Sequence, residues 1–154
     1  MKIPKKIVYK VVAKHHDGRL TSVWVPPSFL VEYKLGEPSR APDALHEADW
    51  DVMAFTSLSE AKHWAAMMVN KRNVNSHRLA VFEALGTGVR NSPGVLNYDI
   101  LRMGLRRALT WFKRYEGARW TVMDSPVDGA VLCTTITLRK ELATFSRFRT
   151  VIFA

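Results

Sequence analysis

The sequence predicts a single α+β domain, an antiparallel-rich sheet with two main helices at about residues 58–70 and 98–115. Three observations favour it. The chain has 154 residues, the size of one ordinary domain. Hydrophobic residues make up 47% and charged residues 24%, which is typical of a globular protein. Short apolar runs separated by turn residues predict strands, and two stretches have the apolar spacing of a helix. Residues 1–154 are therefore assigned to one domain, and any subdivision should fall near 86–96.

The clearest local signal is a strand–helix–strand unit over residues 52–84. Ser57 and Glu60 have the S-x-x-E spacing of a capping box, in which each side chain binds the backbone N–H of the other residue. Apolar residues then recur at intervals of three and four, which places one apolar stripe along the helix. The stripe consists of Leu58, Ala61, Ala65 and Met68.

Before this unit the chain predicts a β-hairpin. The runs 7–14 and 20–25 are apolar and flank Asp17-Gly18, a strong hairpin turn signal. A third strand is expected over 29–35, ending at a glycine. Residues 37–51 are rich in proline, alanine and acids without periodicity, so a long surface loop is expected there.

After this unit, period two places Glu83 on the same face as Leu79 and Val81, so this carboxylate should lie at a sheet edge or face a cavity. Asn97 should cap the second helix and Gly117 should end it. The remaining strands are expected at about 120–123, 130–138 and 144–153, with turns at 124–129 and 139–141.

The net charge of +9 is the strongest global feature, and it is unevenly distributed. Residues 21–60 hold two Lys/Arg and seven acids (−5), whereas residues 101–154 hold ten Lys/Arg and four acids (+6). Such a field favours an anionic partner: nucleic acid, a nucleotide or an acidic protein surface. The alternative is a solvated charged helix face. The candidate binding residues are Arg102, Arg106, Arg107, Lys113, Arg114, Arg147 and Arg149.

Other site classes receive little support. The five histidines lack the spacing of metal ligands, so no metal is expected. The sequence has no phosphate-binding glycine loop or dinucleotide fingerprint, so no cofactor is expected. Cys133 lies in a Thr-rich strand and should be a small buried residue, and a single cysteine favours a reducing, cytoplasmic compartment. No apolar run approaches the length of a membrane helix and the N-terminus lacks the pattern of a signal peptide, so no membrane association is expected.

Phe55-Thr56-Ser57 at the end of one strand and Glu83 in the next resemble the order found in ADP-ribosyltransferases. The resemblance implies an NAD-using enzyme, with Ser57 orienting the nicotinamide pocket and Glu83 holding a ribose hydroxyl. The strand at 8–12 has no counterpart of the family's Arg or His. Ser57 is also already accounted for as a helix cap.

A resemblance that covers about the first ninety residues is to small phage-encoded domains of uncharacterised function. It rests on a Y-K-V-V strand, an E-Y-x-x-G element and an F-x-S-L-x-x-A helix start. These are Tyr9-Lys10-Val11-Val12, Glu32-Tyr33-Lys34-Leu35-Gly36 and Phe55-Thr56-Ser57-Leu58-Ser59-Glu60-Ala61.

The leading functional hypothesis is therefore a small basic binding module of a phage or mobile element. It would act on an anionic partner in nucleic-acid metabolism or host-defence interference. The alternatives are the NAD-using enzyme and a structural or virion-associated protein, in which the tryptophans would line an interface.

Overall fold

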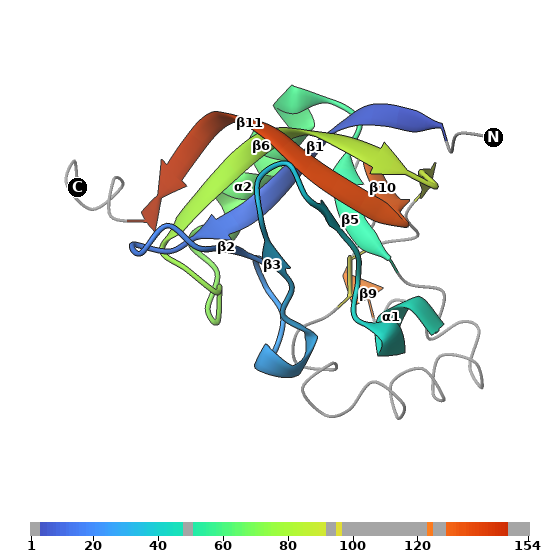
Figure 1. The fold of residues 1–154 in the computed structure, drawn as a ribbon. Helices are drawn as coiled ribbons and strands as arrows, with labels where there is room; N and C mark the ends of the chain where they lie inside the picture. The colour runs from blue at the N-terminus through green and yellow to red at the C-terminus, as the bar shows by residue number, and fades with distance from the viewer. Residues whose placement is uncertain (1–3, 48–50, 92–94, 97–122, 125–128, 148–154) are drawn as a thin grey trace.

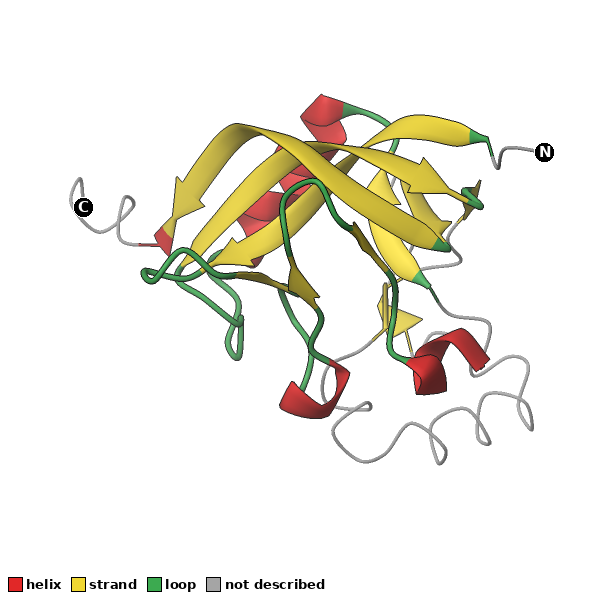
Figure 2. Cartoon of the chain, in the orientation of Figure 1, coloured by secondary structure: helices red, strands yellow, loops and turns green. Residues whose placement is uncertain are grey.

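The computed structural model of the chain describes residues 4–47, 51–91, 95–96, 123–124 and 129–147 (Figure 1). Strands dominate these residues, and one long helix packs on them (Figure 2). In chain order the elements are β1 (Lys5–Lys14), β2 (Leu20–Thr21), η1 (Pro27–Phe29), β3 (Glu32–Tyr33), β4 (Pro38–Ser39), α1 (Asp43–Glu47), β5 (Val52–Phe55), α2 (Leu58–Met68), β6 (Arg78–Thr87), β7 (Arg90–Asn91), β8 (Val95–Leu96), β9 (Met123–Asp124), β10 (Ala130–Cys133) and β11 (Thr135–Ser146).

Within the described residues the main sheet has nine strands, with the order β4-β11-β6-β1-β5-β10-β7, and β2 and β3 extend it beside β1. Every pairing in it is antiparallel. β1 and β6 are in register from Lys5–Thr87 to Ala13–Leu79. Their β-branched and apolar residues suit the pleated surface of a strand that is buried on both faces.

The sheet buries a core on each face. On one face Val11, Leu79 and Val81 pack with Phe55 against α2, which lies behind the long strands in Figure 1. On the other face Val8, Val12 and Phe82 pack against residues from β3, α1 and the segment between them. Because both faces are covered, the central strands are buried along most of their length.

α2 begins where the sequence predicts. The Ser57 hydroxyl accepts a hydrogen bond from the Glu60 N–H at 3.3 Å, which satisfies one of the orphan amides of the first turn. Ala61, Ala65 and Met68 are buried as predicted, and Trp64 joins them. The reciprocal half of the capping box is wrong: within the described chain, no hydrogen bond joins the Glu60 carboxylate to the Ser57 amide. That carboxylate instead packs over Gly129.

The predicted turn at residues 139–141 is also wrong. β11 runs through it, paired with β6, and the ladder shifts register between Leu138 and Lys140 and again between Glu141 and Ala143. The three charged side chains are exposed on this strand. The two shifts in register thus let the strand continue past the charged residues without ending.

The segment before β5 is more ordered than predicted. The predicted surface loop over 37–51 contains β4 and α1, and it buries Ala41, Leu45 and Asp51. The strands predicted over 20–25 and 29–35 shrink to the two-residue strands β2 and β3. The hairpin turn itself is confirmed, since Gly18 has φ of 93° and Ala13 pairs with Thr21.

Where the sequence predicts two main helices, the described residues contain one long helix, α2, besides the five-residue α1. The predicted helix over 98–115 lies outside the described residues. In the part of the chain that is described, no helix has the length and apolar composition required to cross a bilayer.

Candidate functional site

Along one of its sides β1 pairs first with β5 and then with β2, and the sheet has a gap between these two strands. On one side it pairs with β6 throughout. On the other side it meets β5 at Tyr9, opposite Phe55, and then β2 from Ala13 onward. Between these contacts β2 and β5 diverge, which leaves a gap beside Lys10. A cavity of about 110 Å³ occupies this position.

The walls of the cavity are mostly apolar. They come from the segment 22–25 after β2, from Phe29, and from β5, with Trp64 of α2 and Leu45 of α1. The polar groups that line the cavity are Lys10, Ser22, Tyr33 and Asp51. An apolar cavity with a few convergent polar groups is the usual form of a small-molecule site.

Lys10 is the unusual residue of the cavity, because its side chain is 8% exposed on a central strand. Its Nζ donates a hydrogen bond to the Met53 carbonyl at 2.8 Å. β5 pairs with β1 only at Phe55, so the Met53 carbonyl has no backbone N–H of β1 opposite it. The ammonium group of Lys10 supplies the hydrogen-bond donor that this carbonyl needs. The Nζ atom also lies 5.6 Å from the centre of the Tyr33 ring. Burial lowers the pKa of Lys10 to about 8, and the Cys133 thiol acts in the opposite direction.

This shift makes stability rise with pH just above neutrality. The unfolded chain keeps its lysine protonated to about pH 10.5, whereas the folded protein releases this proton near pH 8. The free energy of unfolding should therefore increase by roughly 1 kcal/mol between pH 7 and pH 9. Chemical denaturation of wild type and Lys10→Met at both pH values measures this, and the variant should lack the rise.

Three other titratable groups surround Lys10, and they set the window for that experiment. Burial raises the pKa of Tyr33, which affects stability only above pH 9, and raises that of Cys133 to about 11. Because the thiol of the unfolded chain ionises near pH 9, Cys133 offsets part of the rise by that pH, equally in wild type and Lys10→Met, so the difference between the two proteins isolates Lys10. Asp51 is ionised throughout the range. Lys6→Met, at an exposed position of the same strand, is the matched control and should keep the wild-type profile. Identical profiles for wild type and Lys10→Met would contradict the assignment.

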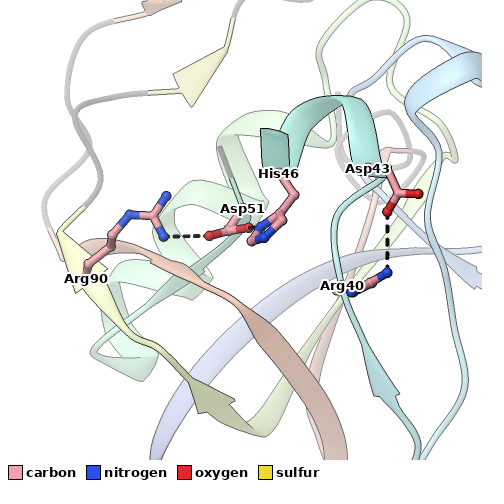
Figure 3. A network of polar contacts seen from close by, with 5 residues as sticks. All are labelled: Arg40, Asp43, His46, Asp51 and Arg90. Atoms are coloured by element: carbon pink, nitrogen blue, oxygen red, sulfur yellow. Dashed lines mark hydrogen bonds and ion pairs between the residues drawn. The ribbon is translucent and has the colours of Figure 1, made fainter. Parts of the chain in front are cut away.

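Asp51 joins three elements at the edge of the cavity (Figure 3). Its side chain is 3% exposed, and it binds Arg90 of β7 at 2.5 Å and the His46 Nδ1 of α1 at 2.7 Å. Burial raises the pKa of Asp51, but the hydrogen bonds from Arg90 and His46 outweigh that effect and hold it below its usual range. The network therefore fastens α1 and β7 to the start of β5.

A second candidate lies at the C-terminal end of α2. We define the cationic loop as residues 69–78, which contains Lys71, Arg72 and Arg78. All three side chains are exposed, and none forms an ion pair within the part of the chain that is described. The sequence from Ala61 to Phe82 contains no acid. Lys71 Nζ lies 5.8 Å from the centre of the Trp24 ring, which adds an aromatic group to this surface.

The cationic loop is held at several points. The Asn75 side chain exchanges two hydrogen bonds with the backbone of Val25, at 3.0 and 3.1 Å, and the Asn75 backbone N–H donates to the Val23 carbonyl at 2.7 Å. The Trp24 Nε1 donates to the Arg72 carbonyl at 3.2 Å. The loop is therefore preorganised, and its charges need little further ordering to meet a partner.

Arg147, one of the predicted binding residues, belongs to this arrangement. Its guanidinium donates to the carbonyls of Val69, at 3.0 Å, and Lys71, at 2.6 Å, just beyond the end of α2. Its backbone N–H donates to the His77 carbonyl at 3.0 Å. Arg147 thus draws the start and the end of the cationic loop together, and its charge suits the negative end of the helix dipole. The other six predicted binding residues lie outside the described residues; they are Arg102, Arg106, Arg107, Lys113, Arg114 and Arg149.

The residues of the NAD-enzyme alternative lie on either side of β1. Ser57 caps α2, and Glu83 is half-buried on β6, opposite Tyr9 of β1 and Lys140 of β11. Glu83 shares the α2-covered face with Leu79 and Val81, as predicted, but β6 is an interior strand and not an edge. Because Ser57 is engaged in capping, this pair provides no clear catalytic arrangement.

The remaining predicted residues are accounted for structurally. Cys133 is buried with a free thiol, as predicted. His15 lies 2.8 Å from the Thr21 hydroxyl, and His16 is exposed in the hairpin turn. Among the described residues, no group of three or more His, Cys, Asp or Glu side chains is placed to hold a metal ion.

Sequence reasoning missed Lys10, the residues that clamp the cationic loop, and Asp51. A signal for Lys10 was present, because period two places it on the core face with Val8 and Val12. Asn75 and Trp24 gave no local signal, since their contacts join segments about fifty residues apart.

A scan of protein-family models gives no match to this chain, and no curated protein or solved structure matches it either.

Proposed function

We propose that the protein is a binding module for an anionic partner, nucleic acid, and that the cationic loop forms part of its contact surface. One observation carries the proposal: Lys71, Arg72 and Arg78 are exposed, form no ion pair with any described residue, and stand on an acid-free segment that Asn75, Trp24 and Arg147 hold in place. Among the other described cations, Lys14, Arg19, Arg40 and Arg90 are paired with carboxylates, whereas Lys5, Lys6 and Lys34 are exposed without such pairs, so the hold on the loop is what distinguishes its cations.

The chemistry of this surface favours phosphates. Lysine and arginine contact phosphate oxygens without reading sequence, and the Trp24 ring lies beside Lys71 on this surface. The net charge of +9 would speed association with a polyanion. The predicted basic helix over 98–115 would add five cations to the contact. The resemblance to phage-encoded domains supports a role in host or phage nucleic-acid metabolism, including interference with host defence.

Salt dependence provides the test. If the three cations each neutralise a phosphate, Lys71→Gln/Arg72→Gln/Arg78→Gln should lower the log–log salt slope by about 3 for duplex DNA. Affinity at moderate salt should fall roughly tenfold or more. Fluorescence anisotropy with a labelled duplex and a labelled single strand, over a range of salt concentrations, measures both quantities.

The matched control is a second triple variant that removes three positive charges outside the cationic loop. Lys5, Lys6 and Lys34 are exposed and form no ion pair within the described residues. Lys5→Gln/Lys6→Gln/Lys34→Gln should change the slope much less than the loop variant. An equal loss in both variants would show that net charge acts without a defined surface. Salt-insensitive binding, or none to any nucleic acid, would contradict the proposal and leave a nucleotide or an acidic protein as the partner.

The predicted basic helix is tested in the same assay. Charge removal at Arg102, Arg106, Arg107, Lys113 and Arg114 should lower the slope further if these residues form one cationic face. A wild-type slope in that variant would restrict the contact to the cationic loop and its neighbours.

A further inference from the structure

We infer that the cavity beside Lys10 is a site for a small, neutral, apolar carbonyl compound, such as an aromatic aldehyde, which Lys10 holds as an imine. This inference does not depend on the proposed function, because it concerns the gap between β2 and β5 and not the cationic loop. It rests on the position of Nζ, on the composition of the walls and on the surroundings of the amine.

The amine is fixed at the cavity wall. One N–H of Lys10 is used by the Met53 carbonyl at 2.8 Å, which positions Nζ at the gap. A neutral amine has a second N–H and a lone pair, and no described residue other than Met53 is hydrogen-bonded to Nζ. With the pKa lowered to about 8, half of the Lys10 side chains are neutral at that pH, against roughly one in 300 for an ordinary lysine.

The surroundings favour a neutral ligand over an ionic one. Phe29, Trp64 and Val52 provide an apolar wall, so a charged ligand would lose its hydration without enough polar partners. Within the described residues no carboxylate forms an ion pair with Lys10. The Asp51 carboxylate that lines the cavity is already bound to Arg90 and His46. A carbonyl with an apolar substituent avoids this cost.

The reaction needs no oxidant or reductant. The Nζ lone pair forms a bond to the carbonyl carbon, and the carbonyl oxygen takes up a proton to give a carbinolamine. Loss of that hydroxyl group as water, with departure of the remaining N–H proton, forms the C=N bond, and the hydrogen bond from Nζ to the Met53 carbonyl is given up in this step. One amine and one carbonyl compound thus give one imine and one water. Burial raises the pKa of Tyr33, so its hydroxyl stays protonated at the pH of the reaction and can serve as a hydrogen-bond donor.

Reductive trapping in the full-length protein tests the site. Benzaldehyde and sodium cyanoborohydride at pH 8 convert an imine to a stable benzylamine, and peptide mass mapping identifies the lysine. Lys10 should be modified at least about tenfold faster than the exposed Lys6 and Lys34, because far more of it is neutral. Modification of the exposed lysines with Lys10 spared would overturn the inference.

Two controls separate the assigned chemistry from its alternatives. Lys10→Met should remove the fast lysine site and leave the slow labelling of exposed lysines unchanged; if fast labelling of a lysine persists, the site lies elsewhere. Glyoxylate, a charged aldehyde, should label exposed lysines and leave Lys10 unmodified. Faster labelling of Lys10 by glyoxylate than by benzaldehyde would show an anion site and contradict a neutral ligand. The wild-type map alone decides the main question, even if the variant does not fold.

Discussion

Replacing Asp51 by alanine is expected to lower the free energy of unfolding by roughly 2–4 kcal/mol. The substitution leaves Arg90 and His46 without their shared carboxylate and detaches α1 and β7 from the start of β5. This expected loss is somewhat smaller than the cost of breaking a fully buried ion pair, because the Arg90 side chain is 36% exposed. Urea denaturation followed by circular dichroism measures the change.

Asp43 provides the matched control, and both carboxylates appear in Figure 3. It pairs with Arg40 at 3.4 Å, but the two side chains are 80% and 68% exposed, so Asp43→Ala should cost no more than about 0.5 kcal/mol.

The stabilisation that Asp51 provides also depends on pH. Because its pKa is lowered in the fold, the stabilisation is present at neutral pH and is lost as the pH falls below about 4. Equal losses for the two variants would contradict the role assigned to Asp51.

The second large effect is expected at Phe55. This side chain is 1% exposed on β5, and its ring centre lies 5.6 Å from that of Trp64 on α2. Phe55→Ala should lower the free energy of unfolding by roughly 3–5 kcal/mol, since it leaves a cavity between the sheet and the helix. Denaturation monitored by tryptophan fluorescence reports the loss, and the emission of the folded variant should shift because Trp64 loses its neighbour.

Leu35, which is 60% exposed, is the control for that change. Leu35→Ala removes an apolar side chain that contributes little to either core and should cost no more than about 0.5 kcal/mol. A small effect at Phe55, similar to that at Leu35, would mean that α2 is not packed on this face of the sheet.

The parts of the fold predicted from the sequence are those with strong local signals. The Ser57 cap and the apolar spacing after it locate α2 at its observed start, and the apolar runs of β1 and β6 locate the two central strands. Asp17-Gly18 fixes the hairpin for the same reason, because the left-handed conformation at Gly18 is a local requirement.

The errors arise where distant contacts decide the structure. A run of charged residues at 139–141 has the composition of a turn, but pairing with β6 continues β11 through it. The segment 37–51 looks like a surface loop because its apolar residues are sparse, yet Ala41 and Leu45 cover the sheet and Asp51 meets Arg90 from β7. No local pattern encodes these contacts.

The candidate sites are likewise predictable where they depend on local sequence and not where they depend on contacts between distant segments. Net charge predicts an anionic partner and selects Arg147, but only the structure shows that Arg147 holds the carbonyls of Val69 and Lys71. Lys71, Arg72 and Arg78 stand in an acid-free stretch that is visible in the sequence, whereas the clamp by Asn75 and Trp24 is not. The cavity beside Lys10 depends on the divergence of β2 and β5, which is a property of the sheet and not of any one strand.

The most direct measurement of the functional proposal is an NMR titration of isotopically labelled protein with a short oligonucleotide at low salt. The proposal predicts that the largest chemical-shift changes fall on residues 69–78, the Trp24 indole and Arg147, and that they fade as salt is added. Changes confined to the distant Lys5 and Lys6, or no changes at all, would contradict a nucleic-acid surface built on the cationic loop.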